Sequence, residues 1–210
     1  VHPTLPVAYV SNTGYDQRTV DVVDLATGAV VQEVSRADAF YGLALAADGS
    51  RLYASGGYSG LLEVYDVAVD GTLAAAGSVS LGGYPAGLAL SVDGARVYVG
   101  LFGGKALVEV DTATLLVART IGLGLKAYGV ALVPQRNEVY VTAFAEGLVG
   151  VVDLASGQLA ARIDLGAGTA LGVGAAADGA SVYVSVADGD VVVRIDTASR
   201  AVAATQAVGE

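Results

Sequence analysis

A unit of 42 to 45 residues recurs five times along this 210-residue chain and leaves almost nothing outside it. Two residue types return at this spacing, a tyrosine within an apolar run and an aspartate at the start of a turn. The tyrosines are Tyr9, Tyr53, Tyr98, Tyr140 and Tyr183, and the aspartates are Asp24, Asp66, Asp111, Asp153 and Asp196. A period of about 40 residues that contains several short strands is typical of a β-propeller. The repeat therefore predicts an all-β propeller.

One unit contains four predicted strands. In the second unit, residues 42–45 form a short apolar run without polar alternation, as expected of a strand buried on both faces. The Asp-Gly pair at 48–49 is a hairpin turn signal, and residues 51–55 follow as a second strand. Residues 61–66 and 73–81 supply the third strand and a more polar outer strand. Each unit thus predicts a four-stranded blade.

Several motifs recur in register with these strands. They are the strands Tyr9-Val10-Ser11-Asn12 and Tyr140-Val141-Thr142, turns of the form Asp-x-Ala-Thr/Ser-Gly, and inner strands of the form Tyr-Gly-Val/Leu-Ala-Leu. By these motifs the whole chain resembles the YVTN-repeat β-propeller family of YncE type. The resemblance implies either an extracytoplasmic or surface-layer binding protein or the amino-terminal propeller of an alkaline-phosphatase-like phosphoesterase. The segments at 55–58 and 67–73 look more like the second group.

The number of units departs from the pattern of that family. Members usually have about seven blades, whereas the units here are residues 1–39, 40–83, 84–125, 126–168 and 169–210. The first unit lacks its inner strand, and the chain contains no methionine. We therefore expect one domain, residues 1–210, that is a fragment of a seven-bladed propeller; the alternative is five blades that close with one irregular junction. An open propeller would expose apolar faces between blades and could oligomerise through them.

The residue types that the chain lacks exclude several kinds of catalytic site. Without cysteine there can be no thiol catalysis, disulfide or cysteine-ligated zinc, and a single histidine, His2, cannot form a multi-histidine metal site. The serines have no credible base partner for the same reason. We expect no catalytic residue, metal or cofactor in this chain. Two enzyme alternatives stay open. One is the accessory propeller of a phosphoesterase or other hydrolase, and the other is a lactonase-like propeller, because the turn at 70–73 resembles the outer turn of such enzymes.

The net charge of −10 has a mainly structural interpretation. Eight of the 21 acidic residues are turn aspartates, whose short carboxylates can accept hydrogen bonds from nearby backbone N–H groups. They are the five aspartates named above and Asp48, Asp93 and Asp178. The acidic chain would repel duplex DNA, and its few basic residues make a weak platform for single-stranded nucleic acid. The Asp-Gly-Asp segment at 188–190 is shorter than a calcium loop.

A membrane span is not expected from the apolar residues, because no run of about 18 of them is free of turn residues.

Most aromatic residues outside the strands fall in one set of loops. In a propeller, the loops that enter inner strands and the loops that join second to third strands lie on the same face. Eight aromatic residues and two lysines occupy these loops: Tyr15, Phe40, Tyr41, Tyr58, Tyr84, Phe102, Lys105, Lys126, Tyr128 and Phe144. Flat rings with phenolic hydroxyls suit a ligand-binding face, whereas packing between neighbouring blades is the alternative interpretation. Arg18 and Arg36 lie near the same loops and would permit an anionic ligand.

These observations predict a non-catalytic binding or scaffold propeller. It would recognise a small molecule, peptide or protein on the aromatic loop face. The family resemblance implies an extracytoplasmic setting, either periplasmic, secreted or at the cell surface.

Overall fold

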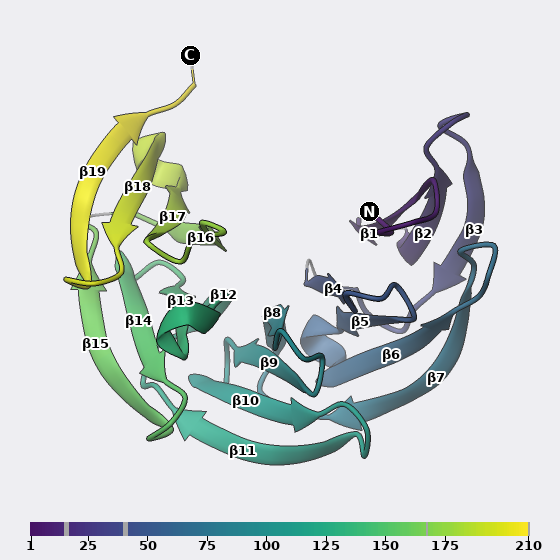
Figure 1. Cartoon of the computed structure of the whole chain (residues 1–210), viewed down its shortest axis with the longest axis horizontal. Coiled ribbons are helices and arrows are strands. Elements are labelled where there is room, and N and C mark those ends of the chain that lie inside the picture. Colours follow the sequence, from purple (N-terminus) through teal and green to yellow (C-terminus); the bar gives the residue numbers. More distant parts are fainter. Residues whose placement is uncertain (15–16, 40–41, 167, 210) are drawn as a thin grey trace.

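The computed structural model describes residues 1–14, 17–39, 42–166 and 168–209. These residues form five antiparallel sheets that stand side by side around a common centre (Figure 1), and we call them blades 1 to 5. Four blades have four strands each, whereas blade 1 has three. The predicted all-β propeller of five repeats is therefore confirmed.

The strands follow one another in chain order. Blade 1 consists of β1 (Val7–Thr13), β2 (Arg18–Asp24) and β3 (Val30–Ser35). Blade 2 consists of β4 (Leu43–Leu45), β5 (Arg51–Ser55), β6 (Leu61–Val67) and β7 (Leu73–Ser80). Blade 3 consists of β8 (Pro85–Leu90), β9 (Arg96–Leu101), β10 (Ala106–Asp111) and β11 (Leu116–Gly122). Blade 4 consists of β12 (Ala127–Val133), β13 (Glu138–Ala143), β14 (Leu148–Asp153) and β15 (Gln158–Asp164). Blade 5 consists of β16 (Ala170–Ala175), β17 (Ser181–Val186), β18 (Val191–Asp196) and β19 (Ala201–Ala207).

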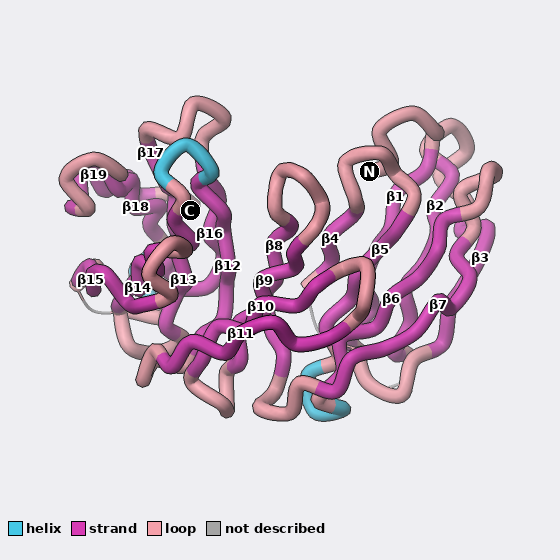
Figure 2. The backbone as a smooth tube through the Cα atoms, turned by 60° about the horizontal axis from the view of Figure 1, so that its bottom comes forward, coloured by secondary structure: helices cyan, strands magenta, loops and turns pink. Residues whose placement is uncertain are grey.

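The inner strands β4, β8, β12 and β16 lie nearest the centre, and the last strand of each blade lies at the rim (Figure 1). Turns and loops gather at the two ends of the strands (Figure 2). Every blade shifts register by one residue where its two outermost strands pair, for example between Val64 and Tyr65 and between Val151 and Val152. Such a bulge increases the local twist of a sheet, so each blade is more strongly twisted at its two outermost strands.

Most of the buried apolar residues lie between successive blades. In the cluster between blades 4 and 5, for example, Tyr140 and Val149 pack with Val182 and Val184. Tyr53 and Tyr98 take equivalent places, since they pack in clusters that contain residues of the following blade. In these three blades, the repeat tyrosine is therefore the residue that the following blade covers.

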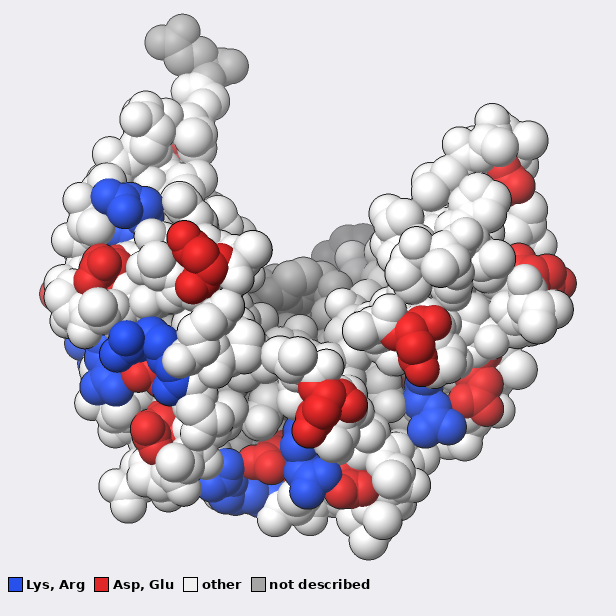
Figure 3. Space-filling view, viewed as in Figure 1, with Lys and Arg blue, Asp and Glu red and all other residues white. Residues whose placement is uncertain are grey.

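The five blades form an arc that is open between blade 1 and blade 5 (Figures 1 and 3). Within the described ranges, none of the four apolar clusters joins these two blades. One face of blade 5 is accordingly uncovered. No helix among the described residues is long and apolar enough to cross a membrane.

The turn aspartates have the structural role that the sequence predicts. All but one accept hydrogen bonds from backbone N–H groups two or three residues further on, as Asp24 does from Ala26 and Thr27. Asp66 differs, because it accepts a hydrogen bond from Nε of Arg51 at 3.0 Å. Backbone and hydroxyl hydrogen bonds lower the pKa of seven aspartates in turns. They are Asp70, in the turn between β6 and β7, and six of the eight turn aspartates: Asp24, Asp48, Asp93, Asp111, Asp153 and Asp196. On the face shown in Figure 3, acidic and basic side chains lie next to one another along the lower and left parts of the arc.

Candidate functional site

Five of the predicted aromatic residues form a continuous row across blades 2, 3 and 4. We call Tyr58, Tyr84, Phe102, Phe144 and Tyr128 the aromatic row. The ring centroids of Tyr58 and Tyr84 lie 4.6 Å apart with their planes nearly perpendicular. The next separations are 5.6 Å from Tyr84 to Phe102, 5.4 Å from Phe102 to Phe144 and 5.1 Å from Phe144 to Tyr128. These distances and tilted or edge-to-face geometries are the ones that aromatic pairs prefer.

Each ring of the row comes from a loop or strand end that the repeat brings to the same face. Tyr58 lies in the 3₁₀ turn Gly57–Ser59 between β5 and β6, and Tyr84 directly precedes β8. Phe102 and Phe144 directly follow the second strands β9 and β13, whereas Tyr128 is the second residue of β12. The repeat therefore places one or two rings per blade at this end of the strands.

The aromatic row lines a pocket of about 490 Å³, to which Gly103 also contributes. Tyr58 is 86% exposed, and the other four rings are half-buried. A pocket of this size is in the range of those that hold small molecules. Packing between blades accounts for the buried part of these rings, but it leaves their exposed faces unexplained.

Backbone hydrogen bonds hold the loops that carry the row. The Gly83 carbonyl accepts from the N–H groups of Gly103 at 2.8 Å and Gly104 at 2.9 Å, and the Tyr84 carbonyl accepts from Phe102 N–H at 3.0 Å. In blade 4, the Lys126 carbonyl accepts from Phe144 N–H, also at 3.0 Å. The rings therefore lie on loops that are hydrogen-bonded to one another, which favours a preformed binding surface.

Three non-glycine residues in these loops adopt positive φ. Tyr84 has φ 61°, Lys105 has φ 48° and Ala145 has φ 56°. A positive φ is uncommon for a residue with a side chain and costs about 1–3 kcal/mol. Such backbone strain clusters at functional sites, and here the strained residue Tyr84 is itself a member of the row.

Two carboxylates anchor the loops from inside. Oδ2 of Asp38, a buried residue, accepts a hydrogen bond from the backbone N–H of Tyr58 at 2.5 Å. Oε1 of Glu146 accepts one from the backbone N–H of Lys126 at 3.0 Å. Because both carboxylates are turned toward backbone donors, they fix the loops that present the aromatic row.

Positive charge lies beside the row in two places, over the middle ring Phe102 and next to the Tyr58 end. Nζ of Lys126 lies 5.8 Å from the centroid of Phe102, within the range of a cation–π contact. A second cavity, of about 250 Å³, adjoins the first because Tyr58 and Tyr84 line both, and Arg18 and Asp38 lie in its wall. The closest approach of Arg18 to the Asp38 carboxylate is 3.8 Å. No ion pair joins Lys126 to a carboxylate in the part of the chain that the structure describes.

Two phenols of the row, Tyr84 and Tyr128, keep their protons at physiological pH because their pKa is raised. Burial raises the pKa of Tyr128, and burial followed by the nearby Tyr58 and Asp38 raises that of Tyr84. A neutral phenol can both donate and accept a hydrogen bond.

The structure brings together only part of the predicted set. Tyr15, Phe40 and Tyr41 lie outside the described residues. Lys105 is exposed on the loop after Phe102, and no contact between it and a described ring is seen. Arg36 is not on this surface, because its buried guanidinium pairs with Glu63 and donates to the Ser55 carbonyl at 2.9 Å. Asp38 and Glu146 were not predicted, since a loop carboxylate gives no sequence signal for the distant backbone that it will bind.

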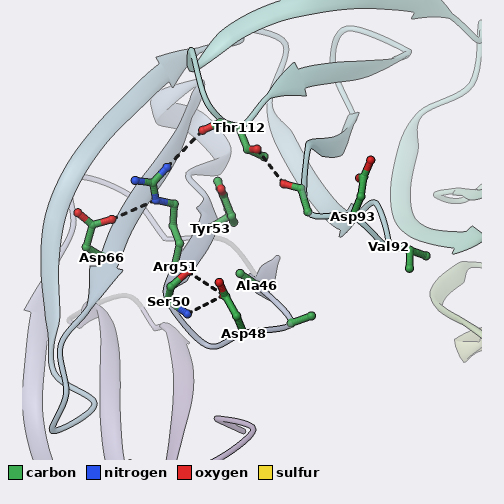
Figure 4. A pocket seen from close by; sticks show the side chains of 11 residues that line it. Ala46, Asp48, Ser50, Arg51, Tyr53, Asp66, Val92, Asp93 and Thr112 are labelled. Carbon is green, nitrogen blue, oxygen red and sulfur yellow. Dashed lines mark hydrogen bonds and ion pairs between the residues drawn. The ribbon is translucent and has the colours of Figure 1, made fainter.

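A larger cavity, of about 560 Å³, lies between blades 2 and 3 at the other end of the strands (Figure 4). Arg51 crosses it and donates to Asp66 and to the Thr112 carbonyl, and Asp48 accepts from the backbone and hydroxyl of Ser50. Its carboxylates thus have protein donors. In the described ranges, no group of three histidine, cysteine or acidic residues could hold a metal ion. We therefore take the aromatic row as the candidate site.

Comparisons with known proteins show the fold. No protein-family model matches the chain, and no curated protein matches its sequence. The structure of dihydro-heme d1 dehydrogenase NirN in complex with DHE matches all of this chain with a TM-score of 0.72 and 21% identity. The Kuenenia stuttgartiensis hydrazine synthase matches all of it with a TM-score of 0.66 and 17% identity. The match spans 45% of the NirN chain and 89% of the hydrazine synthase chain. This chain is thus a β-propeller, and it spans less than half the length of the NirN chain.

Proposed function

We propose that this propeller is a non-catalytic binding module whose aromatic face takes a flat, largely apolar small molecule with an anionic group. The aromatic row carries this proposal. Its five rings line one pocket of about 490 Å³ from three separate blades, and four of them keep only part of their surface buried. Flat ligands gain stacking and edge contacts from such a surface.

The charge of the ligand is inferred from the surroundings of the row. Lys126 lies over the Phe102 ring, whereas the carboxylates of Asp38 and Glu146 face backbone N–H groups. The chain as a whole is acidic, with a net charge of −10, so a local cation matters for an anion that approaches this face. An anionic group beside Lys126 would gain a charge-assisted hydrogen bond.

A small molecule is favoured over a peptide by one further observation. The similar structure of NirN is a complex with DHE. At 21% identity this likeness shows a shared fold, so it supports only the general class of partner. As part of the same proposal, we place the chain with the YVTN-repeat propellers of YncE type and in an extracytoplasmic setting. A secretory signal encoded upstream of Val1 would support that setting, and a leaderless cytoplasmic reading frame would refute it.

The proposal is tested by calorimetric titration with two probes that share a naphthalene ring and carry opposite charges. We expect 2-naphthoate to bind more tightly than 2-naphthylmethylammonium. Tyr58→Ala and Phe102→Ala should each weaken 2-naphthoate binding by about 5- to 150-fold, because stacking on an aromatic ring contributes about 1–3 kcal/mol. Tyr58 is 86% exposed, so its removal should leave the β-sheet circular dichroism unchanged. Equal binding of 2-naphthoate to wild type and both variants would refute the aromatic face as the site.

The two lysines of the chain provide a matched pair for the charge. Lys126→Gln should reduce the preference for the anionic probe by about fivefold, the value of roughly 1 kcal/mol for one exposed ion pair. Lys105→Gln removes the same charge from an exposed position with no described contact to the row and should change the preference little. An equal loss in both variants would mean that net charge, not the site, selects the ligand.

A further inference from the structure

In blades 2 to 4, a glycine near the start of the inner strand lies against the backbone of the next blade. A side-chain Cβ would lie 2.3 Å from the carbonyl oxygen of Ala86 at Gly42, 2.4 Å from that of Tyr128 at Gly87, and 2.5 Å from that of Leu171 at Gly129. In every case the carbonyl belongs to the residue just before the corresponding glycine of the following blade. Only glycine allows so close an approach, so this glycine marks the junction between two blades.

Blade 5 carries the same glycine with nothing packed against it. Gly172 occupies the position of Gly129, and the nearest described atom to a Cβ there would be Ser185 Oγ at 3.1 Å. No carbonyl of another blade lies near it in the described part of the chain. Blade 5 thus has the space left by a missing Cβ, but no described carbonyl of a following blade lies against it as in blades 2 to 4.

A hydroxyl completes the junction between blades 4 and 5 and is repeated in blade 5. Thr142 Oγ1 accepts from Gly129 N–H at 2.7 Å and donates to the Leu171 carbonyl of the next blade at 2.8 Å. In blade 5, Ser185 Oγ accepts from Gly172 N–H at 2.9 Å. Ser185 is exposed, so its own O–H points to no carbonyl of a described blade. The donor for an incoming backbone carbonyl is therefore in place.

The repeat tyrosine shows the same difference. Tyr53, Tyr98 and Tyr140 are 3%, 6% and 0% exposed because the following blade covers them, whereas Tyr183 is 45% exposed. Strand β17 is correspondingly exposed at Tyr183 and Ser185, although the equivalent strand β13 is buried at all six positions. One face of blade 5 thus repeats the glycine and tyrosine of blades 2 to 4, and the hydroxyl of blade 4, without their partner.

We infer that this face of blade 5 is a docking surface for a complete four-stranded propeller blade, packed as blade 5 packs on blade 4. The occupant must have an inner strand, because the carbonyl that meets the glycine lies at the start of that strand. Blade 1 of a second copy does not fit this requirement, since its described strands begin with β1, the counterpart of the second strand β5. The partner is therefore a blade from additional propeller polypeptide.

The test extends the chain by one blade. The bond from Val208 N–H to the Asp190 carbonyl in blade 5 repeats that from Leu165 N–H to the Gly147 carbonyl in blade 4. This correspondence sets the join, so a copy of residues 168–210 is appended directly after Glu210. Nitration of tyrosines by tetranitromethane, read by peptide mass spectrometry, then reports whether Tyr183 is covered. Tyr58, at 86% exposed, is the internal control.

In the extended chain, we expect nitration of Tyr183 to fall at least fivefold while nitration of Tyr58 is unchanged. We expect amide exchange in β17 to slow as well. Gly172→Ala, made only at the original position, should restore nitration of Tyr183 in the extended chain. In the 210-residue chain the same change should shift the thermal midpoint by less than about 2 °C, because only the rotatable Ser185 hydroxyl is near.

Two results would overturn the inference. In one, Tyr183 is nitrated equally in both chains and protease trims the appended blade. In the other, the 210-residue chain sediments as a dimer with Tyr183 protected, which would make a second copy the occupant. Because the readouts lie on blade 5, either result would leave the proposed binding of 2-naphthoate at the aromatic row untouched.

Discussion

Gly129→Ala is the substitution whose effect follows most directly from the geometry of the blade junctions. The new Cβ would lie 2.5 Å from the Leu171 carbonyl oxygen, 2.8 Å from Thr142 Oγ1 and 3.0 Å from Val173 Cγ1. A carbonyl held in the backbone of blade 5 cannot move away as a flexible side chain can. Blades 4 and 5 must therefore separate at this point, or the backbone of β12 must distort.

The magnitude has two parts. Forcing an extra methyl group into a packed junction costs about 1–3 kcal/mol. Separation also weakens the two hydrogen bonds that Thr142 makes to Gly129 and Leu171, each with a net contribution of about 1 kcal/mol. We expect Gly129→Ala to lower the free energy of unfolding by about 3–5 kcal/mol. For a chain of this size, that corresponds to a fall of about 6–20 °C in the thermal midpoint.

Gly172→Ala is the matched control, because it makes the same chemical change at the same strand position without a following blade. Urea unfolding, followed by circular dichroism of the β-structure at 218 nm, gives the free energy of unfolding of both variants. A precision of about 1 kcal/mol suffices to separate them. We expect the cost at Gly172 to be below about 1 kcal/mol. Equal costs at the two glycines, or a cost below about 1 kcal/mol at Gly129, would refute the close-approach explanation of the repeated glycine.

Three further predictions concern turns and titration. Gly28 has φ 73° and no atom within 4 Å of the place that a Cβ would take, so Gly28→Ala should lower the free energy of unfolding by about 1–2 kcal/mol through the backbone alone. The control Gly122→Ala in β11, where φ is not positive, should lower it less, and equal losses in urea unfolding would contradict this. Stability should fall as pH drops below about 4, because the seven aspartates in turns with lowered pKa lose their ionised, hydrogen-bonded form there; a urea midpoint that stays constant from pH 5 to pH 2 would argue against it. Burial, followed by the Glu63 carboxylate, raises the pKa of Tyr65 to about 12, so its contribution to stability should be complete below pH 10 and be lost as pH rises toward 12. Glu63→Gln should lower the pKa of Tyr65 in a spectrophotometric titration, and an unchanged titration curve would exclude that carboxylate as a cause.

The strands could be predicted closely from the sequence because their signals are local. The apolar run at 42–45 and the turn at 48–49 place β4 and β5, and the outer strand predicted at 73–81 is β7, Leu73–Ser80. The missing inner strand of the first unit was also visible as a missing apolar run. Alternation and turn residues are patterns of a few neighbouring positions. Because the same patterns recur in several units, each unit supports the assignment made in the others.

The candidate site could be predicted only in outline. The topology of a blade assigns loops to a face, so the aromatic residues of one loop class were expected together. The ring-to-ring contacts, the positive φ of Tyr84 and the hydrogen bond from Tyr58 N–H to Asp38 depend on how blades 1 to 4 pack, and the bonded partners Tyr58 and Asp38 are 20 residues apart in the sequence. Arg36 shows the same limit, since its partner Glu63 lies in another blade and removes its charge from the surface.

The most direct test of the account is the crystal structure of this chain with 2-naphthoate bound. We predict that the naphthalene ring lies in contact with Tyr84 and Phe102 and that its carboxylate lies within hydrogen-bond distance of Lys126 Nζ. Ligand density in the cavity between blades 2 and 3 at the opposite end of the strands, or on the uncovered face of blade 5 alone, would contradict the assignment of the aromatic row as the binding site.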